Sequence, residues 1–124
     1  MKIGFDIGGV ISRYPEKMIQ LMGILQMGGA EVYVITDIPF DIAVELCAKN
    51  HIAIAQDRII SCDWGKHMDL CKTKACEELG IDFLIDDRPD YCAVGDFIGL
   101  VVSPRPLTAK YYHETWVNQE KLAT

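Results

Sequence analysis

The stretch KIGFDIGGVI, residues 2–11, decides how the rest of the chain is interpreted. Its apolar residues do not alternate with polar ones and are bounded by turn formers, which is typical of a strand buried on both faces of a parallel sheet. Asp6 then lies at the carboxyl end of that strand, where open α/β sheets bind ligands. Gly8 and Gly9 permit a sharp turn and a close approach of the backbone to a ligand. The alternative is a tight turn in which Asp6 only caps the backbone.

Composition predicts one domain over residues 1–124, because the chain is long enough for one core and 50% of it is hydrophobic. Twelve basic against eighteen acidic side chains give a net charge of −6, so we expect no strong binding of nucleic acid. Five cysteines without a CxxC pair or a signal peptide predict reduced thiols and a cytoplasmic protein. No apolar run is long enough to cross a bilayer, so no membrane partner is expected.

Strand and helix patterns alternate along the rest of the chain. They predict helices over 15–27, 39–50 and 68–79, strands over 31–35, 58–62, 82–85 and 97–102, and a surface helix over 107–123. With right-handed crossovers, this order predicts an α/β fold, a three-layer sandwich around a five-stranded parallel, Rossmann-like sheet.

Polar side chains follow three of the predicted strands, namely Asp6, the pair Thr36-Asp37, and the pair Asp86-Asp87. If the first strand is central, they converge in one crevice. Carboxylates so close together repel one another unless a hard cation lies among them, and carboxylates with water suit Mg²⁺.

A lysine is expected to complete this site. At 100° per residue, Lys72 lies on the flank of the apolar stripe of helix 68–79, whereas Lys74 points away from it. Lys72 is therefore the lysine expected to reach inward. With a lysine and a hydroxyl beside the metal, the natural ligand is a phosphate.

These motifs resemble, in order and spacing, those of the haloacid dehalogenase-like superfamily over nearly the whole chain: FDIGGV at 5–10, VITD at 34–37, Lys72, and LIDD at 84–87. The segment IDDRPD at 85–90 is also similar to that of the family's 5′-nucleotidases. The resemblance implies that Asp6 is the nucleophile and that Thr36 and Lys72 hold the phosphate. It further implies a Mg²⁺ site completed by an acidic pair, here Asp86 and Asp87. The backbone carbonyl of Gly8 joins Asp6 among the expected metal ligands, and Asp37 is assigned to the substrate side. Capping of the helix after Pro39 explains Asp37 equally well.

The chain departs from the family in two ways. Gly8 stands where the family's phosphatases usually carry a second Asp, and such an acid or base typically contributes about 10²–10⁴-fold. The segment between Asp6 and Thr36 is too short for a cap domain, and capless relatives tend to act on exposed or macromolecular phosphates or use a neighbouring subunit as the cover. We therefore expect a Mg²⁺-dependent phosphohydrolase acting on a phosphate ester, such as a nucleotide or an exposed phosphate. The alternative is a degenerate relative that binds metal or a phosphorylated ligand without turnover.

Other interpretations are weaker. Residues 6–9 are also similar to the phosphate loop of sugar kinases related to actin, but that fold needs a β-hairpin next and a far longer chain. A zinc site is conceivable at Cys62, His67, Cys71 and Cys76, although the spacing matches no ligand motif. An aromatic stripe, at Tyr111, Tyr112 and Trp116, indicates core packing or a subunit contact, which leaves a homo-oligomer open.

Overall fold

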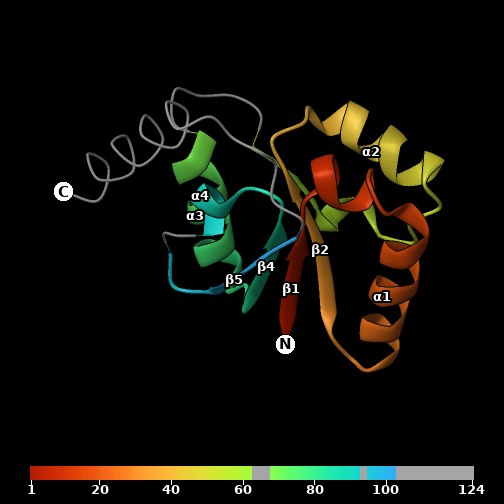
Figure 1. The fold of residues 1–124 in the computed structure, drawn as a ribbon, viewed down its shortest axis with the longest axis horizontal. Helices are drawn as coiled ribbons and strands as arrows, with labels where there is room; N and C mark the ends of the chain where they lie inside the picture. The colour runs from red at the N-terminus through yellow and green to blue at the C-terminus, as the bar shows by residue number, and fades with distance from the viewer. Residues whose placement is uncertain (63–67, 93–94, 103–124) are drawn as a thin grey trace.

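The computed structural model describes residues 1–62, 68–92 and 95–102, which form a parallel sheet flanked by helices (Figure 1). The strands are β1 (Lys2–Phe5), β2 (Glu31–Thr36), β3 (Ile59–Ser61), β4 (Phe83–Asp86) and β5 (Ile98–Val101). Their order across the sheet is β3-β2-β1-β4-β5, and every neighbouring pair is parallel. The predicted α/β class with five parallel strands is therefore confirmed, and the arrangement is consistent with a Rossmann-like sandwich.

Helices cover both faces of the sheet. Helices α1 (Pro15–Met27) and α2 (Phe40–Lys49) lie on one face, and α3 (Met68–Leu79) and the short α4 (Pro89–Cys92) lie on the other (Figure 1). Two clusters of buried apolar side chains fill the spaces between the layers. One joins strand residues such as Phe5 to Met22 of α1, and the other joins Leu84 to Cys76 of α3 and Tyr91 of α4.

Most predicted elements are found within a residue or two of their expected bounds. The main difference is α4, which is not among the helices that the sequence predicted. Pro89 is the first residue of this helix, a position at which its fixed φ and missing N–H are tolerated. The predictions for the helix over 107–123 and for the aromatic stripe at Tyr111, Tyr112 and Trp116 lie outside the described residues, as does His67.

Two features of the described residues concern the expected reduced thiols and the expected lack of a segment that crosses a bilayer. All five cysteines lie in the described ranges, and each is free. Among the helices of the described ranges, none is long and apolar enough to cross a membrane.

Strand β1 lies at the centre of the sheet and determines where the site forms. Phe5 is in register with Val34 of β2 and with Ile85 of β4. The next residues, Asp6 and Asp86, therefore leave neighbouring strands at the same level, and the backbone N–H of Asp6 still donates to the carbonyl of Ile85 at 3.0 Å. The chain passes from one side of β1 to the other between β3 and β4, which makes this edge the switch point at which α/β sheets bind ligands.

Candidate active site

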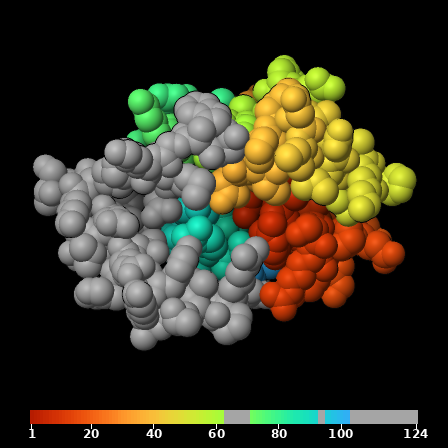
Figure 2. Space-filling model, turned by 90° about the horizontal axis from the view of Figure 1, so that it is seen from above, coloured from red at the N-terminus to blue at the C-terminus, as the bar shows by residue number. Residues whose placement is uncertain are grey.

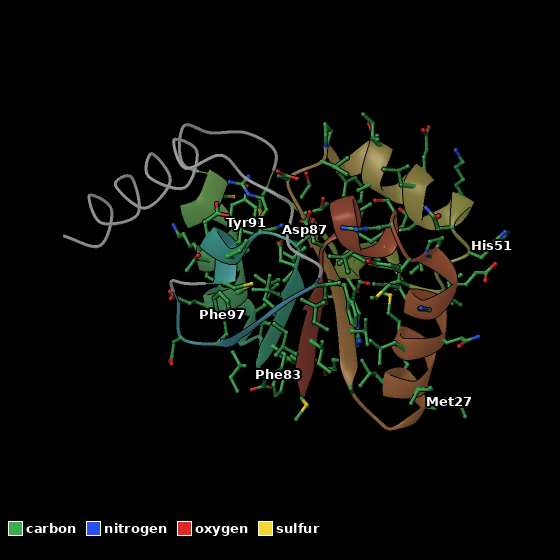
Figure 3. All side chains as sticks on the ribbon, in the orientation of Figure 1. Met27, His51, Phe83, Asp87, Tyr91 and Phe97 are labelled. Atoms are coloured by element: carbon green, nitrogen blue, oxygen red, sulfur yellow. The ribbon has the colours of Figure 1, made fainter. Side chains whose placement is uncertain are left out.

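Three carboxylates meet at the carboxyl end of β1 and β4, and we call Asp6, Asp86 and Asp87 the acidic cluster. One oxygen of each lies within 4.8 Å of the others, and all three side chains are buried. Figure 2 looks down on this end of the molecule and shows the segments that follow β1, β2 and β4 meeting there. In Figure 3, Asp87 lies beside the turn after β1, whereas His51 lies far away at the exposed end of α2. The structure thus brings together the carboxylates that the sequence predicted as metal ligands.

Lys72 bridges two members of the acidic cluster. Its ammonium nitrogen lies 2.6 Å from Oδ2 of Asp86 and 3.2 Å from Oδ1 of Asp6, and its side chain is 1% exposed. Lys74, by contrast, is 70% exposed and lies 3.9 Å from Glu78 one helical turn away. The prediction that Lys72 is the inward lysine of α3 is confirmed.

Burial and charge pull the pKa values of these groups in different directions. Burial raises the pKa of Asp6, and raises that of Asp86 to about 7, although the nearby Lys72 lowers both. Burial alone would lower the pKa of Lys72, but Asp6 and Asp86 outweigh it and hold the pKa above its ordinary value. The lysine therefore stays charged, and the excess of negative charge around it favours a proton or a cation among the carboxylates.

Asp86 and Asp87 differ in their surroundings. Both oxygens of Asp86 are engaged, because Oδ2 contacts Lys72 and Oδ1 accepts a hydrogen bond from the backbone N–H of Arg88 at 3.0 Å. Asp87 points instead toward the turn after β1, with its carboxylate against Gly9. In this arrangement, Asp86 is the carboxylate that orients Lys72. Asp87 is the carboxylate that faces the turn after β1.

The turn after β1 spans Ile7–Ile11, and we call it the glycine loop. Oδ1 of Asp6 accepts a hydrogen bond from the backbone N–H of Ile7 at 2.9 Å, so the carboxylate is fixed at the start of this loop. Gly8 has φ −65° and ψ 125°, and Gly9 has φ 73°. The left-handed conformation that favours glycine is therefore at Gly9 and not at Gly8.

Thr36 and Asp37 lie at the end of β2, next to β1. The Thr36 side chain is fully buried, and its hydroxyl oxygen accepts a hydrogen bond from the backbone N–H of Ile38 at 3.2 Å. Asp37 is half-buried, and its charge is close enough to raise the pKa values of both Asp6 and Lys72. The alternative role of Asp37 as a cap is wrong, since α2 begins after Pro39 without any side-chain cap.

The side chains of Arg88, Asp90 and Tyr91 contact one another around α4, an arrangement that the sequence did not predict. The guanidinium of Arg88 donates to both oxygens of buried Asp90, at 2.5 and 3.2 Å, and to the Tyr91 hydroxyl at 2.7 Å. The ring of Tyr91 lies under the ammonium of Lys72, 4.5 Å from nitrogen to ring centroid. Arg88 therefore holds α4 together, and Tyr91 packs beneath the lysine that enters the site. Arg105, another arginine near a predicted strand end, lies outside the described ranges.

The donor set of the acidic cluster fits a hard divalent cation. It offers only carboxylate oxygens, the ligands that Mg²⁺ and Ca²⁺ prefer. When ionised, three carboxylates against one ammonium leave two uncompensated negative charges, which a divalent cation neutralises. Asp6, Asp86 and Asp87 would hold the ion, and Lys72 would face a ligand of opposite charge beside it.

The zinc site considered from the sequence finds little support. Within the described residues, the acidic cluster is the one group suited to hold a metal.

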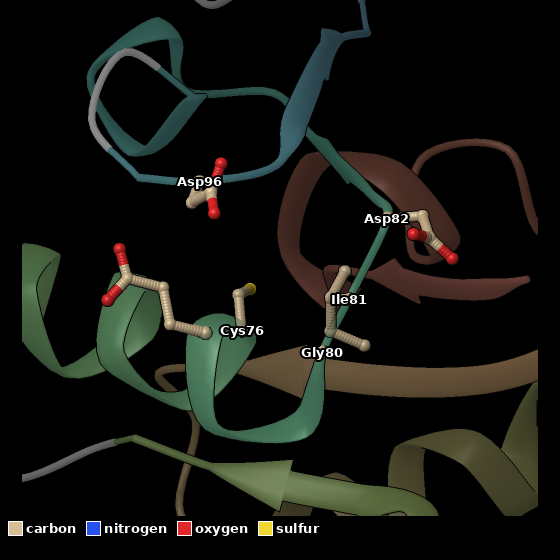
Figure 4. Close-up of a pocket in the computed structure, with 6 residues that line it drawn as sticks. Cys76, Gly80, Ile81, Asp82 and Asp96 are labelled. Atoms are coloured by element: carbon tan, nitrogen blue, oxygen red, sulfur yellow. The ribbon is translucent and has the colours of Figure 1, made fainter.

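A separate hollow opens at the opposite end of β4. This pocket of about 420 Å³ is lined by Cys76, Glu77, Gly80, Ile81, Asp82 and Asp96 (Figure 4). It contains none of the residues predicted for catalysis, phosphate binding or the Mg²⁺ site, so we assign the chemistry to the acidic cluster.

Comparison of the chain with protein-family models, with curated proteins and with solved structures finds no match. The function is therefore inferred from the geometry of the acidic cluster and the residues that surround it.

Proposed function

We propose that this protein is a Mg²⁺-dependent phosphohydrolase of the haloacid dehalogenase-like type, which acts through an aspartyl-phosphate on Asp6. The observation that carries the proposal is the position of Lys72, buried between Asp6 and Asp86 with Asp87 beside them. A chain without phosphate chemistry has little physical reason to bury one ammonium and three carboxylates at a switch point of the sheet.

The proposed reaction has two displacements. A carboxylate oxygen of Asp6 attacks phosphorus, the bond from phosphorus to the ester oxygen breaks, and the released alkoxide takes a proton from water, which yields the alcohol and a hydroxide ion. Water then attacks the same phosphorus and gives up a proton, which that hydroxide accepts. This step releases inorganic phosphate and restores the Asp6 carboxylate. Lys72 offsets charge on the phosphoryl oxygens, and bound Mg²⁺ supplies further charge stabilisation.

Substrate binding in this proposal uses Lys72 and the end of β2. The Thr36 hydroxyl and half-buried Asp37 lie one strand away from Asp6, so both can contact a phosphate ester seated there. The residues between Asp6 and Thr36 form the glycine loop, α1 and β2, and this segment is too short to hold a cap domain as well. Because we expect no cap over the site, we propose that the substrate is a small phosphate ester, such as a nucleotide, or an exposed phosphate on a larger molecule.

The position of Gly8 favours a second candidate function, which is binding of metal or a phosphorylated ligand without turnover. Gly8 offers no side-chain acid to protonate the leaving group, and such an acid is typically worth about 10²–10⁴-fold.

One experiment separates the two functions. The protein is incubated with p-nitrophenyl phosphate or acetyl phosphate and Mg²⁺, and product release and a covalent adduct are followed by absorbance and mass spectrometry. Hydrolysis or an adduct that Asp6→Asn abolishes supports the hydrolase. Asp57→Asn, at an exposed aspartate of the turn before β3, is the matched control and should behave like wild type. No turnover and no adduct over a broad panel of esters would leave the binding function in its place.

A further inference from the structure

The backbone of Gly9 lies directly against the carboxylate of Asp87. A Cβ atom added at Gly9 would stand 2.0 Å from Oδ2 of Asp87, 2.4 Å from Cγ and 3.0 Å from Cβ. Favourable contacts between nonbonded heavy atoms lie at about 3.5–4.0 Å, so the first two separations are sterically impossible and the third is tight. Asp87 can occupy its present position only because residue 9 has no side chain.

The backbone conformation of Gly9 does not by itself explain this contact. Gly9 has φ 73°, and Gly80 at the end of α3 has φ 71°, so both are in the left-handed region. A Cβ at Gly80 would meet no atom within 4 Å. The two positions therefore share a backbone cost for any other residue, and only Gly9 adds a clash with a member of the acidic cluster.

The glycine loop is tied down on both sides of Gly9, so it cannot easily move away from Asp87. The backbone N–H of Gly9 donates to the hydroxyl oxygen of Ser12 at 3.1 Å. The backbone N–H of Ser12 donates to the carbonyl of Ile7 at 2.9 Å, and the N–H of Ile7 donates to Asp6. A side chain at position 9 would therefore displace the Asp87 carboxylate, or else break the loop that holds Asp6.

We propose that Gly9 is a positioning residue for the metal site, whose bare α-carbon lets Asp87 approach Asp6 closely enough to share a divalent cation. This inference rests on the proposed function, because it takes the acidic cluster to bind Mg²⁺. It adds the requirement of glycine at position 9, which the presence of the three carboxylates alone does not reveal. Without glycine at position 9, all three carboxylates can be present and still fail to form one site.

The test compares Mg²⁺ binding by wild type, Gly9→Ala and Gly80→Ala, measured by calorimetry and by thermal melts with Mg²⁺ and with EDTA. Both variants carry the same backbone cost, and Gly80 lies in the pocket of Figure 4, away from the acidic cluster. We expect Gly80→Ala to bind Mg²⁺ like wild type and Gly9→Ala to bind it about tenfold or more weakly, as for other losses of ligand orientation. Equal affinity in the two variants would overturn the inference.

A second measurement keeps the inference separate from the proposed function. In EDTA, the loss of melting temperature caused by Gly9→Ala is compared in wild type and in Asp87→Ala, which lacks the atoms at 2.0 and 2.4 Å. We expect the loss to be larger in wild type, and if Gly9→Ala alone does not fold, the double variant should fold. An equal loss in both backgrounds, or a double variant that also fails to fold, would refute the contact. Absence of Mg²⁺ binding by wild type would instead refute the metal site of the proposed function, whatever this comparison gives.

Discussion

Replacing Lys72 with methionine keeps the length of the side chain and removes its charge from the centre of the site. In wild type the ammonium lies 3.2 Å from Asp6 and 2.6 Å from Asp86, and neither contact is exposed to solvent. The variant would leave two carboxylates buried beside each other, with Asp87 close by. We expect a large loss of stability at pH 8, because an unpaired buried charge costs far more than a lost surface contact.

The magnitude follows from these distances. At an effective dielectric constant of about 20, each contact represents a gross attraction of roughly 5–6 kcal/mol, most of which offsets the cost of burying the charges. Removal of one partner of a buried pair typically costs about 3–5 kcal/mol, so we expect about 4 kcal/mol here. For 124 residues, at about 2.1 cal/mol/K of unfolding entropy per residue, this corresponds to a fall of about 15 °C in Tm.

The assay is thermal and urea unfolding in EDTA, with Lys74→Met as the matched control on the same helix. Lys74 is 70% exposed and lies 3.9 Å from Glu78, so its replacement should change the free energy of unfolding by less than about 1 kcal/mol. A Lys72→Met protein whose Tm lies within a few degrees of Lys74→Met at pH 8 would refute the reasoning.

The pH dependence provides an independent check. The pKa of Asp86 is raised to about 7, mainly by burial, and losing Lys72 raises it further. A raised carboxyl pKa means that the folded state binds the proton more tightly than the unfolded state, so stability increases as the pH falls through that pKa. The difference in free energy of unfolding between Lys72→Met and wild type should therefore become smaller from pH 8 to pH 5. If this difference becomes larger over the same range, the raised pKa of Asp86 is contradicted.

Three further predictions concern the metal and the loop. Asp87→Asn should abolish the rise in Tm caused by Mg²⁺, while Asp86→Asn should only weaken it, because Asp86 already contacts Lys72 and the Arg88 N–H. If calorimetry shows that Asp86→Asn loses more Mg²⁺ affinity than Asp87→Asn, the metal-binding roles of the two residues are exchanged. The Mg²⁺-dependent rise in Tm should be larger at pH 8 than at pH 5, since the raised pKa of Asp86 lets a proton compete with the ion, and equal shifts would argue against this competition. Gly8→Asp should raise hydrolysis of p-nitrophenyl phosphate by up to about 10²-fold, because φ of −65° at Gly8 imposes no left-handed penalty, and a rate below wild type would count against the added acid.

The sequence alone determined the order of the elements and the residues that end the strands. Apolar periodicity and turn formers act over a few residues, so they identify β1, α1 and α3 without knowledge of the neighbouring elements. The same local geometry separates Lys72 from Lys74, since the direction of a side chain on a helix depends only on its phase. Five polar positions at strand ends and one inward lysine were therefore predictable.

Only the tertiary structure decided how these groups meet. The register that places Asp6 level with Asp86 depends on pairing between strands far apart in the chain, and no local pattern encodes it. The different surroundings of Asp86 and Asp87 arise because Asp86 contacts Lys72 and the Arg88 N–H, whereas the carboxylate of Asp87 lies against Gly9. The glycine pair predicted a turn, but which of the two lies against Asp87 depends on how the loop folds over β4, a contact between residues 9 and 87 that neither segment specifies alone.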